Sequence, residues 1–344
     1  MEMKAYRWAA FFCFAGILLF LLFPEPCAEG VREGIRLSGG VLIPSLFPIS
    51  VLSTLLVRLD PPERRNGAAK RVAGIIQLPE ACTRLFLLGA LGGYPLGAQL
   101  TAELCADGKL RREDAVRFSA FCNHAGPAFL IGALGIGVFG NPLRGADLWI
   151  IQILSSLLVA CVFSLRKAPS VQNLSVSQTP PKPKAGLLPS AIASCAASML
   201  RLAGSVCFFR ALLRCAAAAL PIGALPVSVL TAASGVLDLS GAVLRLPLLP
   251  QKTAFLTASF LTGFGGLCVH LQAASSFSAA GLPLKRYLSG KLLQGIFALC
   301  LAVPYCRFYE TRVFAVGSVL AGALAVIFFT IRAKKHWKSS HSVL

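Results

Sequence analysis

The stretch from Leu88 to Gly108 constrains this chain more than any other, because it lies in an apolar surrounding and yet is rich in residues that break helices. Five such residues fall within nine positions: Gly89, Gly92, Gly93, Pro95 and Gly97. Inside a helix, a glycine costs about 1 kcal/mol relative to alanine and a proline about 3 kcal/mol. Non-helical backbone is tolerated at membrane depth only where it is buried in protein or lines a watery cavity. The stretch therefore predicts a broken helix at a transport site of a membrane protein.

The composition supports a membrane protein. Only 14% of the residues are charged and 56% are hydrophobic, whereas an ordinary soluble domain has about 25% charged residues. The net charge of +19 falls mostly in short loops and at the C-terminus, as in the cytoplasmic loops of membrane proteins. No basic stretch alternates with base-stacking aromatic residues, so nucleic acid is not an expected partner. We predict an all-α polytopic membrane protein with about 8–10 membrane segments, embedded in a lipid bilayer.

The cysteine and histidine residues give no sign of a metal site or a disulfide framework. Most of the twelve cysteines lie inside apolar segments, and no two of them form a CxxC pair, so they are expected to act as small apolar residues. The four histidines do not cluster with the cysteines, and we therefore expect no metal ion. The sequence also contains no nucleophile with a nearby base and no phosphate-binding loop. We expect no cofactor and no enzymatic activity.

The apolar runs predict the order of the membrane segments. An uncleaved first span is expected from Arg7 to Phe23, because no clear cleavage site follows it and Pro24 ends it abruptly. Glycines and prolines predict a kink in the run from Leu37 to Val57. Further spans are expected from Phe118 to Phe139 and from Asp147 to Leu165. In the second half, apolar runs extend over Cys215 to Leu239, Ala254 to Ala280, Tyr287 to Val303 and Val313 to Ile331.

An internal repeat appears when the sequence is shifted by 173 residues. The shift places Gly92-Gly93 on Gly265-Gly266, Gln99 on Gln272, and the basic Arg112 on the basic Lys285. We predict a first membrane repeat over 1–166, a flexible polar linker over 167–184, a second membrane repeat over 185–332 and a basic cytoplasmic tail over 333–344. Duplicated halves with paired interrupted helices are typical of secondary transporters, whose substrate binds near the midplane between the repeats.

The loop charges leave the topology open. If the segment from Val72 to Cys105 is a re-entrant hairpin, three basic loops lie inside: Arg58 to Arg71, Lys109 to Arg112 and Arg166 to Lys184. If that segment crosses the membrane once, the two halves are inverted and the lysine-containing linker lies outside. The sequence favours neither topology.

The first candidate site is the GGYPLGAQ motif, which contains Gly92, Gly93, Tyr94, Pro95 and Gln99. Its glycines free backbone N–H and C=O groups for binding. A helix that begins after Pro95 would direct the positive end of its dipole toward a ligand, which suits a carboxylate. The alternative is a kink that only allows close helix packing.

The second candidate site is the FCNHAGP motif, in which Asn123 and His124 precede Gly126 and Pro127. Polar groups at membrane depth usually face the protein interior. Asn123 either donates to a substrate oxygen or bonds a carbonyl freed by Pro127.

The third candidate site surrounds the second glycine break, where Gly265 and Gly266 are followed by His270 and Gln272. A histidine can be neutral or charged at pH 7, so His270 either binds an anion, relays a proton, or is a structural residue bonded to a backbone carbonyl. Asp238 is the one acid deep in the apolar part of the second half. It is either a coupling site or, as we slightly prefer, a span end near the outer surface.

Four motifs together resemble a known family. They are GGYPLGAQ, FCNHAGPAFLIGALGIGVFGN, GFGGLCVHLQ and LKRYLSGKLLQG. The chain resembles the YlbJ (SpoVV) family of sporulation integral membrane proteins, with a nucleoside recognition (Gate) type of domain, from about Gly34 to Val303. The resemblance implies a protein of the outer forespore membrane in endospore-forming bacteria that moves dipicolinic acid toward the spore. Dipicolinate is a flat dicarboxylate, which agrees with helix N-termini and a basic inner face.

The expected function is therefore transport of a small organic anion, foremost dipicolinate, in a bacterial cell membrane. Two other functions are considered: a transporter of nucleosides or other small neutral solutes, and a structural membrane protein of spore assembly that transports nothing. The sequence does not decide whether the chain forms a homo-oligomer, which ion couples transport, or in which direction the solute moves.

Overall fold

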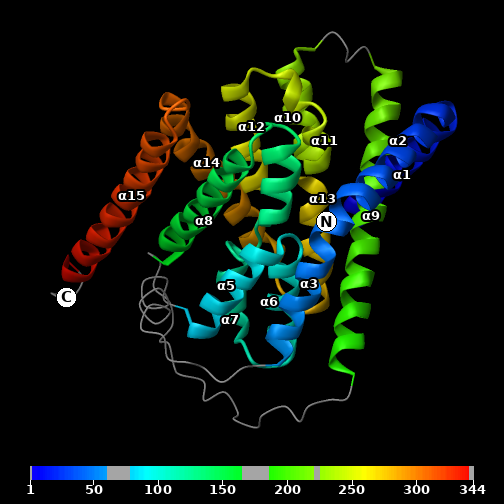
Figure 1. Ribbon diagram of the computed structural model, residues 1–344. Coiled ribbons are helices and arrows are strands. Elements are labelled where there is room, and N and C mark those ends of the chain that lie inside the picture. Colours follow the sequence, from blue (N-terminus) through cyan, green and yellow to red (C-terminus); the bar gives the residue numbers. More distant parts are fainter. Residues whose placement is uncertain (1, 60–77, 165–185, 221–224, 341–344) are drawn as a thin grey trace.

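The computed structural model describes residues 2–59, 78–164, 186–220 and 225–340 (Figure 1). Within these ranges the chain is almost entirely helical and contains no strand. The all-α class is therefore confirmed for the described residues. The predicted linker over 167–184 and the last four residues of the predicted tail lie outside them.

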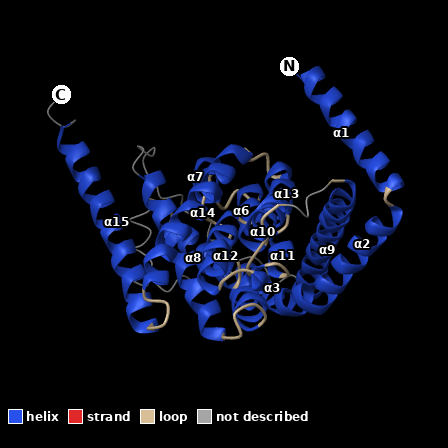
Figure 2. Ribbon diagram, turned by 90° about the horizontal axis from the view of Figure 1, so that it is seen from above, coloured by secondary structure: helices blue, strands red, loops and turns tan. Residues whose placement is uncertain are grey.

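The helices fall into two series along the chain. The first series comprises α1 (Glu2–Leu22), α2 (Pro24–Leu37), the π-helix η1 (Ser38–Leu42), α3 (Ile43–Arg58), α5 (Glu80–Gly92), α6 (Leu96–Ala106), α7 (Arg112–Ser119), the π-helix η2 (Ala128–Ile136) and α8 (Pro142–Ser164). The second comprises α9 (Leu187–Ala219), α10 (Val227–Leu237), α11 (Leu239–Val243), η4 (Leu246–Leu248), α12 (Gln251–Phe264), α13 (Gly266–Ala279), α14 (Leu284–Arg307) and α15 (Arg312–Ser340). Seen from above, α1 and α15 lie at opposite sides of the molecule (Figure 2).

Only some of the expected membrane spans are full-length helices. Four described helices are long and apolar enough to cross a membrane, or five if Ala10–Leu22 and Pro24–Leu42, bent by 100°, form one span. Five further apolar helices have 10–17 residues, whereas a straight crossing takes about 20 residues. The polytopic class is confirmed, but glycines and prolines divide several of the expected membrane segments into shorter helices.

The first break reverses the chain. α5 ends at Gly92 and α6 begins at Leu96, and a Cβ added to Gly89 would lie 3.1 Å from the Cα atom of Gly97. In a continuous helix, eight residues would separate these two positions by about 12 Å. The segment α5–α6 is therefore a re-entrant hairpin, with Gly93, Tyr94 and Pro95 at its tip. A hairpin here agrees with the first of the two topologies, although residues 72–77 of that segment lie outside the described residues and the topology stays a prediction.

The second break does not reverse the chain. Gly265 adopts a left-handed conformation (φ +98°) between α12 and α13, and glycine reaches this conformation without the strain other residues incur. The two helices still form one candidate span of 29 residues from Gln251 to Ala279. The two glycine breaks thus have different geometries, although the internal shift of 173 residues places one on the other.

Corresponding segments after the breaks run in the same direction. Nη2 of Arg112, at the start of α7, donates to the Gly281 carbonyl just before α14 at 2.7 Å. Near the start of α8, Asp147 forms an ion pair with Arg312 at the start of α15, with 2.7 Å between Nη2 and Oδ1. Because Gly290 of α14 also lies against Ala120, just after α7, these two segments run in the same direction, as parallel halves require. The repeat itself stays a prediction. The exact domain boundaries stay a prediction.

Described residues next to the expected basic loops gather at one end of the molecule, and we call it the basic end. Nη1 of Arg58, the last residue of α3, donates to Ser190 Oγ near the start of α9 at 3.0 Å. The same arginine lies 3.9 Å from Glu103 near the end of α6. The guanidinium of Arg286, at the start of α14, lies 4.3 Å from the ring centroid of Phe163 at the end of α8. By the positive-inside rule we expect this end to face the cytoplasm.

The expected span from Phe118 to Phe139 is wrong as a continuous helix. α7 ends at Ser119, the chain from Ala120 to Pro127 is irregular, and the π-helix η2 begins at Ala128. The run from Cys215 to Leu239 is likewise divided, because α9 ends at Ala219 and α10 begins at Val227. The first span ends before Pro24 as expected.

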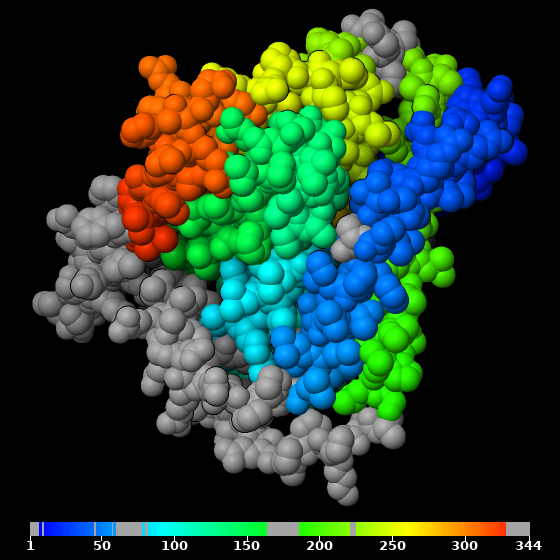
Figure 3. Space-filling model, in the orientation of Figure 1, coloured from blue at the N-terminus to red at the C-terminus, as the bar shows by residue number. Residues whose placement is uncertain are grey.

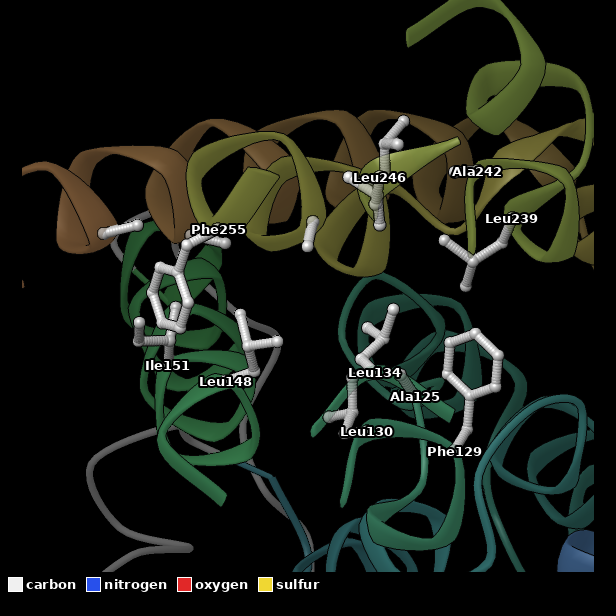
Figure 4. Close-up of a cluster of buried hydrophobic side chains, with 14 of the residues drawn as sticks. Ala125, Phe129, Leu130, Leu134, Leu148, Ile151, Leu239, Ala242, Leu246 and Phe255 are labelled. Atoms are coloured by element: carbon white, nitrogen blue, oxygen red, sulfur yellow. The ribbon is translucent and has the colours of Figure 1, made fainter. Parts of the chain in front are cut away.

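The main hydrophobic core joins the two halves. Figure 4 shows Phe255 of α12 beside Leu148 and Ile151 of α8, all of which are buried. Leu134 of η2 and Leu246 of η4 belong to the same cluster. On the surface, Figure 3 shows the teal region of η2 and α8 between the yellow region of the second half and the cyan hairpin. The core therefore joins η2 and α8 of the first half to η4 and α12 of the second.

Candidate functional site

Glycines on two sides hold the irregular segment from Ala120 to Pro127. A Cβ on Gly97 of α6 would overlap the carbonyl oxygen of Cys122, and a Cβ on Gly290 of α14 would overlap that of Ala120. A Cβ on Gly93 would lie 2.9 Å from the backbone nitrogen of Gly126. The segment therefore lies between the hairpin and α14 at distances that only glycine allows. This position brings Asn123 and His124 into the interior, where neither side chain is exposed.

The two breaks contact each other through Tyr94. Its hydroxyl donates a hydrogen bond to the carbonyl oxygen of Thr262 in the last turn of α12. Carbonyls in the last turn of a helix have no partner within that helix. The hydroxyl at the first break thus donates directly to a backbone carbonyl in the helix turn that precedes the second break.

Lys291 of α14 lies where the two breaks meet, and its side chain is completely buried. Its ammonium Nζ donates to the Asn123 carbonyl at 2.9 Å and to Gln294 Oε1 at 2.7 Å. The same atom lies 5.2 Å from the centroid of the Tyr94 ring. No described carboxylate forms an ion pair with it. An ammonium buried in this way is costly, and ionisable residues inside membrane segments usually mark functional sites.

Tyr287 connects the second and third candidate sites. Its hydroxyl accepts from Asn123 Nδ2 at 3.3 Å and lies 3.4 Å from His270 Nδ1. Tyr287 and Lys291 are four residues apart on α14 and therefore lie on the same face. We call Tyr94, Asn123, His270, Tyr287 and Lys291 the central polar cluster. The bonded partner of both Asn123 and His270 is thus a hydroxyl rather than the backbone carbonyl that the structural alternatives supposed.

Four of the predicted site residues keep an unpartnered polar atom. These buried atoms are Asn123 Oδ1, His124 Nδ1, His270 Nε2 and Gln272 Oε1. The opposite nitrogen of His124 bonds Ser156 Oγ of α8 at 2.8 Å, and Gln272 Nε2 donates to Cys268 Sγ at 3.3 Å. Native proteins leave few buried polar groups unsatisfied, and each one requires an explanation.

An apolar cavity lies between the two breaks. It has about 450 Å³ of free space, counting its open side, and Tyr94 and Gly126 line it together with Cys268 and Val269 of α13. Lys291 does not line the cavity but lies behind Tyr94, which does, and Gly265 lies between them. The position that a Cβ on Gly265 would occupy is 3.4 Å from Val269 Cγ1, 3.6 Å from the Tyr94 hydroxyl and 3.6 Å from Lys291 Cε.

Asp238 lines the same cavity from the N-terminal end of α11. Its carboxylate accepts from the backbone nitrogens of Ser240 and Gly241 and from the Ser240 hydroxyl. The residue is 2% exposed, and it lies at a helix end, as the preferred interpretation supposed; its depth in the membrane stays a prediction.

Gln99 lies apart from the central polar cluster, in a second, more polar groove between α6, α9 and α13. Its Nε2 donates to Ser198 Oγ at 2.7 Å. The groove has about 670 Å³ of free space, counting its open side. Three pairs of lining positions are related by the shift of 173 residues: Ala102 and Ser275, Glu103 and Ser276, and Ala106 and Ala279. α6 and α13 thus direct corresponding faces into the groove.

The end opposite the basic end is held by a cluster around Asp147, which is 2% exposed. Its carboxylate accepts from the Tyr305 hydroxyl at 2.6 Å, in addition to the ion pair with Arg312. Nη1 of Arg144 donates to the Tyr305 hydroxyl at 2.7 Å. Burial raises the pKa of the nearby Tyr309 hydroxyl above its usual value. The cluster connects α8, α14 and α15.

The sequence interpretation missed Lys291, Tyr287 and Gln294. All three lie within the LKRYLSGKLLQG motif, which the sequence analysis used only for its resemblance. The signal that was available is a lysine within the apolar run from Tyr287 to Val303, since a charge inside a span is a functional hypothesis by itself.

The fold and the site define an all-α polytopic membrane protein in which two broken helices meet beside a buried lysine. Over 330 residues the chain is 25% identical to the sporulation integral membrane protein YlbJ of Bacillus subtilis (strain 168), covering 84% of this chain and 80% of the relative. This similarity supports a relationship to the YlbJ family. No family model matches the chain, and no solved structure matches it. The Gate type of domain stays a prediction.

Proposed function

We propose that this chain is a sporulation membrane protein that transports a small organic anion, foremost dipicolinate, across the outer forespore membrane. The similarity to YlbJ supports the sporulation role. The observation that supports an anionic substrate is Lys291, a fully buried ammonium that no described carboxylate neutralises. The proposal involves no enzymatic step and no cofactor.

The energetics of Lys291 favour an anionic ligand. Removing an ammonium from water costs several kcal/mol even after the protein relaxes. Its two hydrogen bonds, to Asn123 and Gln294, go to neutral oxygens, so the third N–H and the positive charge remain for a ligand. A carboxylate that reaches the cavity beside Gly265 would neutralise this charge, and the apolar walls suit an aromatic ring.

The hairpin gives a physical basis for alternating access. Re-entrant and broken helices at membrane depth line the substrate path in secondary transporters. Here a hydrogen bond between the Tyr94 hydroxyl and the Thr262 carbonyl joins the hairpin tip to α12. Movement of the tip away from α12 would open the space beside Lys291. The groove at Gln99 lies near the basic end, where positive loops attract anions.

The test is uptake of labelled dipicolinate into liposomes that contain the purified protein. We expect wild-type protein to accumulate dipicolinate and Lys291→Met to lower the rate by roughly tenfold or more, because a buried charge pair contributes on the order of 2 kcal/mol or more. The matched control is Lys285→Met, at an exposed lysine of the first turn of α14, which should leave uptake unchanged.

Two experimental outcomes would contradict the proposal and favour another function. Competition by uridine but not by dicarboxylates would favour a nucleoside transporter. Absence of flux for every solute, with correctly folded protein, would favour a structural membrane protein of spore assembly.

A further inference from the structure

A second buried cation, Arg210 of α9, lies near the apolar cavity. The residue is 7% exposed, and its Nε and Nη2 atoms are buried without a hydrogen-bond partner. The acids near it are bonded elsewhere. Glu33 of α2 pairs with Arg214, and Asp238 accepts from Ser240 and Gly241. Arg210 therefore forms no ion pair with a described carboxylate.

The position of Arg210 follows from its helix. Leu202 and Val206 of α9 line the apolar cavity, and Arg210 lies on the same helix face, one turn beyond Val206. Its Nη1 lies 3.7 Å from the position that a Cβ on Gly241 would occupy, and so does Oδ2 of Asp238. Because Asp238 lines the cavity, the guanidinium lies at the Asp238 side of it.

The two buried cations approach the cavity from opposite sides. Lys291 belongs to α14 and lies next to the cavity wall at Tyr94, with its Nζ 5.2 Å from the centroid of the Tyr94 ring. Arg210 belongs to α9, and Figures 1 and 2 both place α9 and α14 on opposite sides of α13. Apart from Asp238, Ser240 and the Tyr94 hydroxyl, the side chains that line the cavity are apolar.

We propose that Arg210 forms a second anion subsite, so that the cavity selects an anion with two carboxylates on a compact apolar body. One carboxylate binds Lys291 and the other binds the unpartnered Nε and Nη2 atoms of Arg210. A guanidinium edge with two free donors matches a carboxylate in a bidentate arrangement, which a lysine cannot reproduce. A monocarboxylate leaves one buried cation without a ligand. The inference rests on the proposed transport of an organic anion.

The experiment compares two ligands of the same ring by calorimetric titration of the full-length protein in nanodiscs. Pyridine-2,6-dicarboxylate carries two carboxylates and pyridine-2-carboxylate carries one. We expect wild-type protein to bind the dicarboxylate at least about tenfold more tightly, since a charge-assisted hydrogen-bonded pair contributes on the order of 1.5–3 kcal/mol. Arg210→Gln should abolish this preference, because it should weaken the binding of the dicarboxylate but not that of the monocarboxylate.

Two further variants separate the roles of the cations. Arg214→Gln is the matched control, because Arg214 lies one turn further along α9 and its side chain is 51% exposed. It should keep the wild-type preference. Lys291→Met should weaken the binding of both ligands. Arg210→Lys should keep the positive charge but lose most of the preference, because it loses the bidentate geometry.

The outcomes distinguish this inference from the proposed function. Equal affinity of wild-type protein for the two ligands overturns the inference, whatever the variants do. The inference is also overturned if Arg210→Gln keeps the preference for the dicarboxylate, or if it loses affinity for both ligands equally. Failure of wild-type protein to bind either ligand overturns the proposed transport of dipicolinate.

Discussion

Tyr94 joins the two broken helices through a hydrogen bond, so its hydroxyl can be removed while the ring stays in place. In Tyr94→Phe the Thr262 carbonyl loses its donor in a buried position. We expect the free energy of unfolding to fall by about 0.5–1.5 kcal/mol, the net contribution of one hydrogen bond. Thermal unfolding in detergent measures this change.

The control for this substitution is Tyr309→Phe. The Tyr309 ring is also buried, but its hydroxyl forms no hydrogen bond with a described residue. It should therefore change stability little. If Tyr94→Phe and Tyr309→Phe unfold at the same temperature, the contact between the breaks does not stabilise the fold.

At the same scale, the polar residues of the site were predictable but their partners were not. Asn123, His124, His270 and Gln272 attract notice in the sequence because each is a polar residue in an apolar run. Their connection through Tyr287 and Lys291 depends on α14, which lies about 160 residues from Asn123 in the chain. Sequence spacing within one motif contains no information about such a contact.

At the scale of elements, the irregular segment from Ala120 to Pro127 depends on glycines of other helices. In Gly97→Ala, the added methyl group would overlap the Cys122 carbonyl oxygen, which is backbone and cannot rotate away. We expect a loss of about 3 kcal/mol in the free energy of unfolding, the upper range for overpacking, together with loss of dipicolinate uptake. Denaturation and liposome uptake measure the two effects.

A second glycine provides the control. Gly204 lies within α9, and a Cβ there would have no atom within 4 Å. Gly204→Ala should therefore stabilise the helix by up to about 1 kcal/mol. A Gly97→Ala variant as stable as Gly204→Ala would show that the hairpin and the irregular segment do not pack as described.

The same glycines explain why the sequence predicted the breaks but not their geometry. Glycine and proline weaken a helix locally, so the positions of both breaks follow from composition. Whether the chain then reverses depends on a contact between α5 and α6, where Gly89 meets Gly97, and the second break has no such pair. The expected span from Phe118 to Phe139 failed for a related reason, since the glycines that hold its irregular part lie on α6 and α14.

At the scale of the whole molecule, the direction of the two halves is a testable property. Arg112 and Lys285 are related by the internal shift, and both are exposed near the basic end. In parallel halves, cysteines at these two positions lie on the same side of the membrane, whereas in inverted halves they lie on opposite sides. Glu310, in the connection between α14 and α15, is exposed at the other end.

We therefore expect a membrane-impermeant thiol reagent to label Arg112→Cys and Lys285→Cys only from the cytoplasmic side, and Glu310→Cys only from the other side. The background should carry serine at Cys13 and Cys300, the two cysteines exposed in the described residues. Labelling of Arg112→Cys and Lys285→Cys from opposite sides would establish inverted halves and contradict the parallel arrangement. Labelling of both from the outside would keep the parallel arrangement but reverse the orientation. The proposed attraction of anions from the cytoplasm by the basic end would then be wrong, because that end would face away from it.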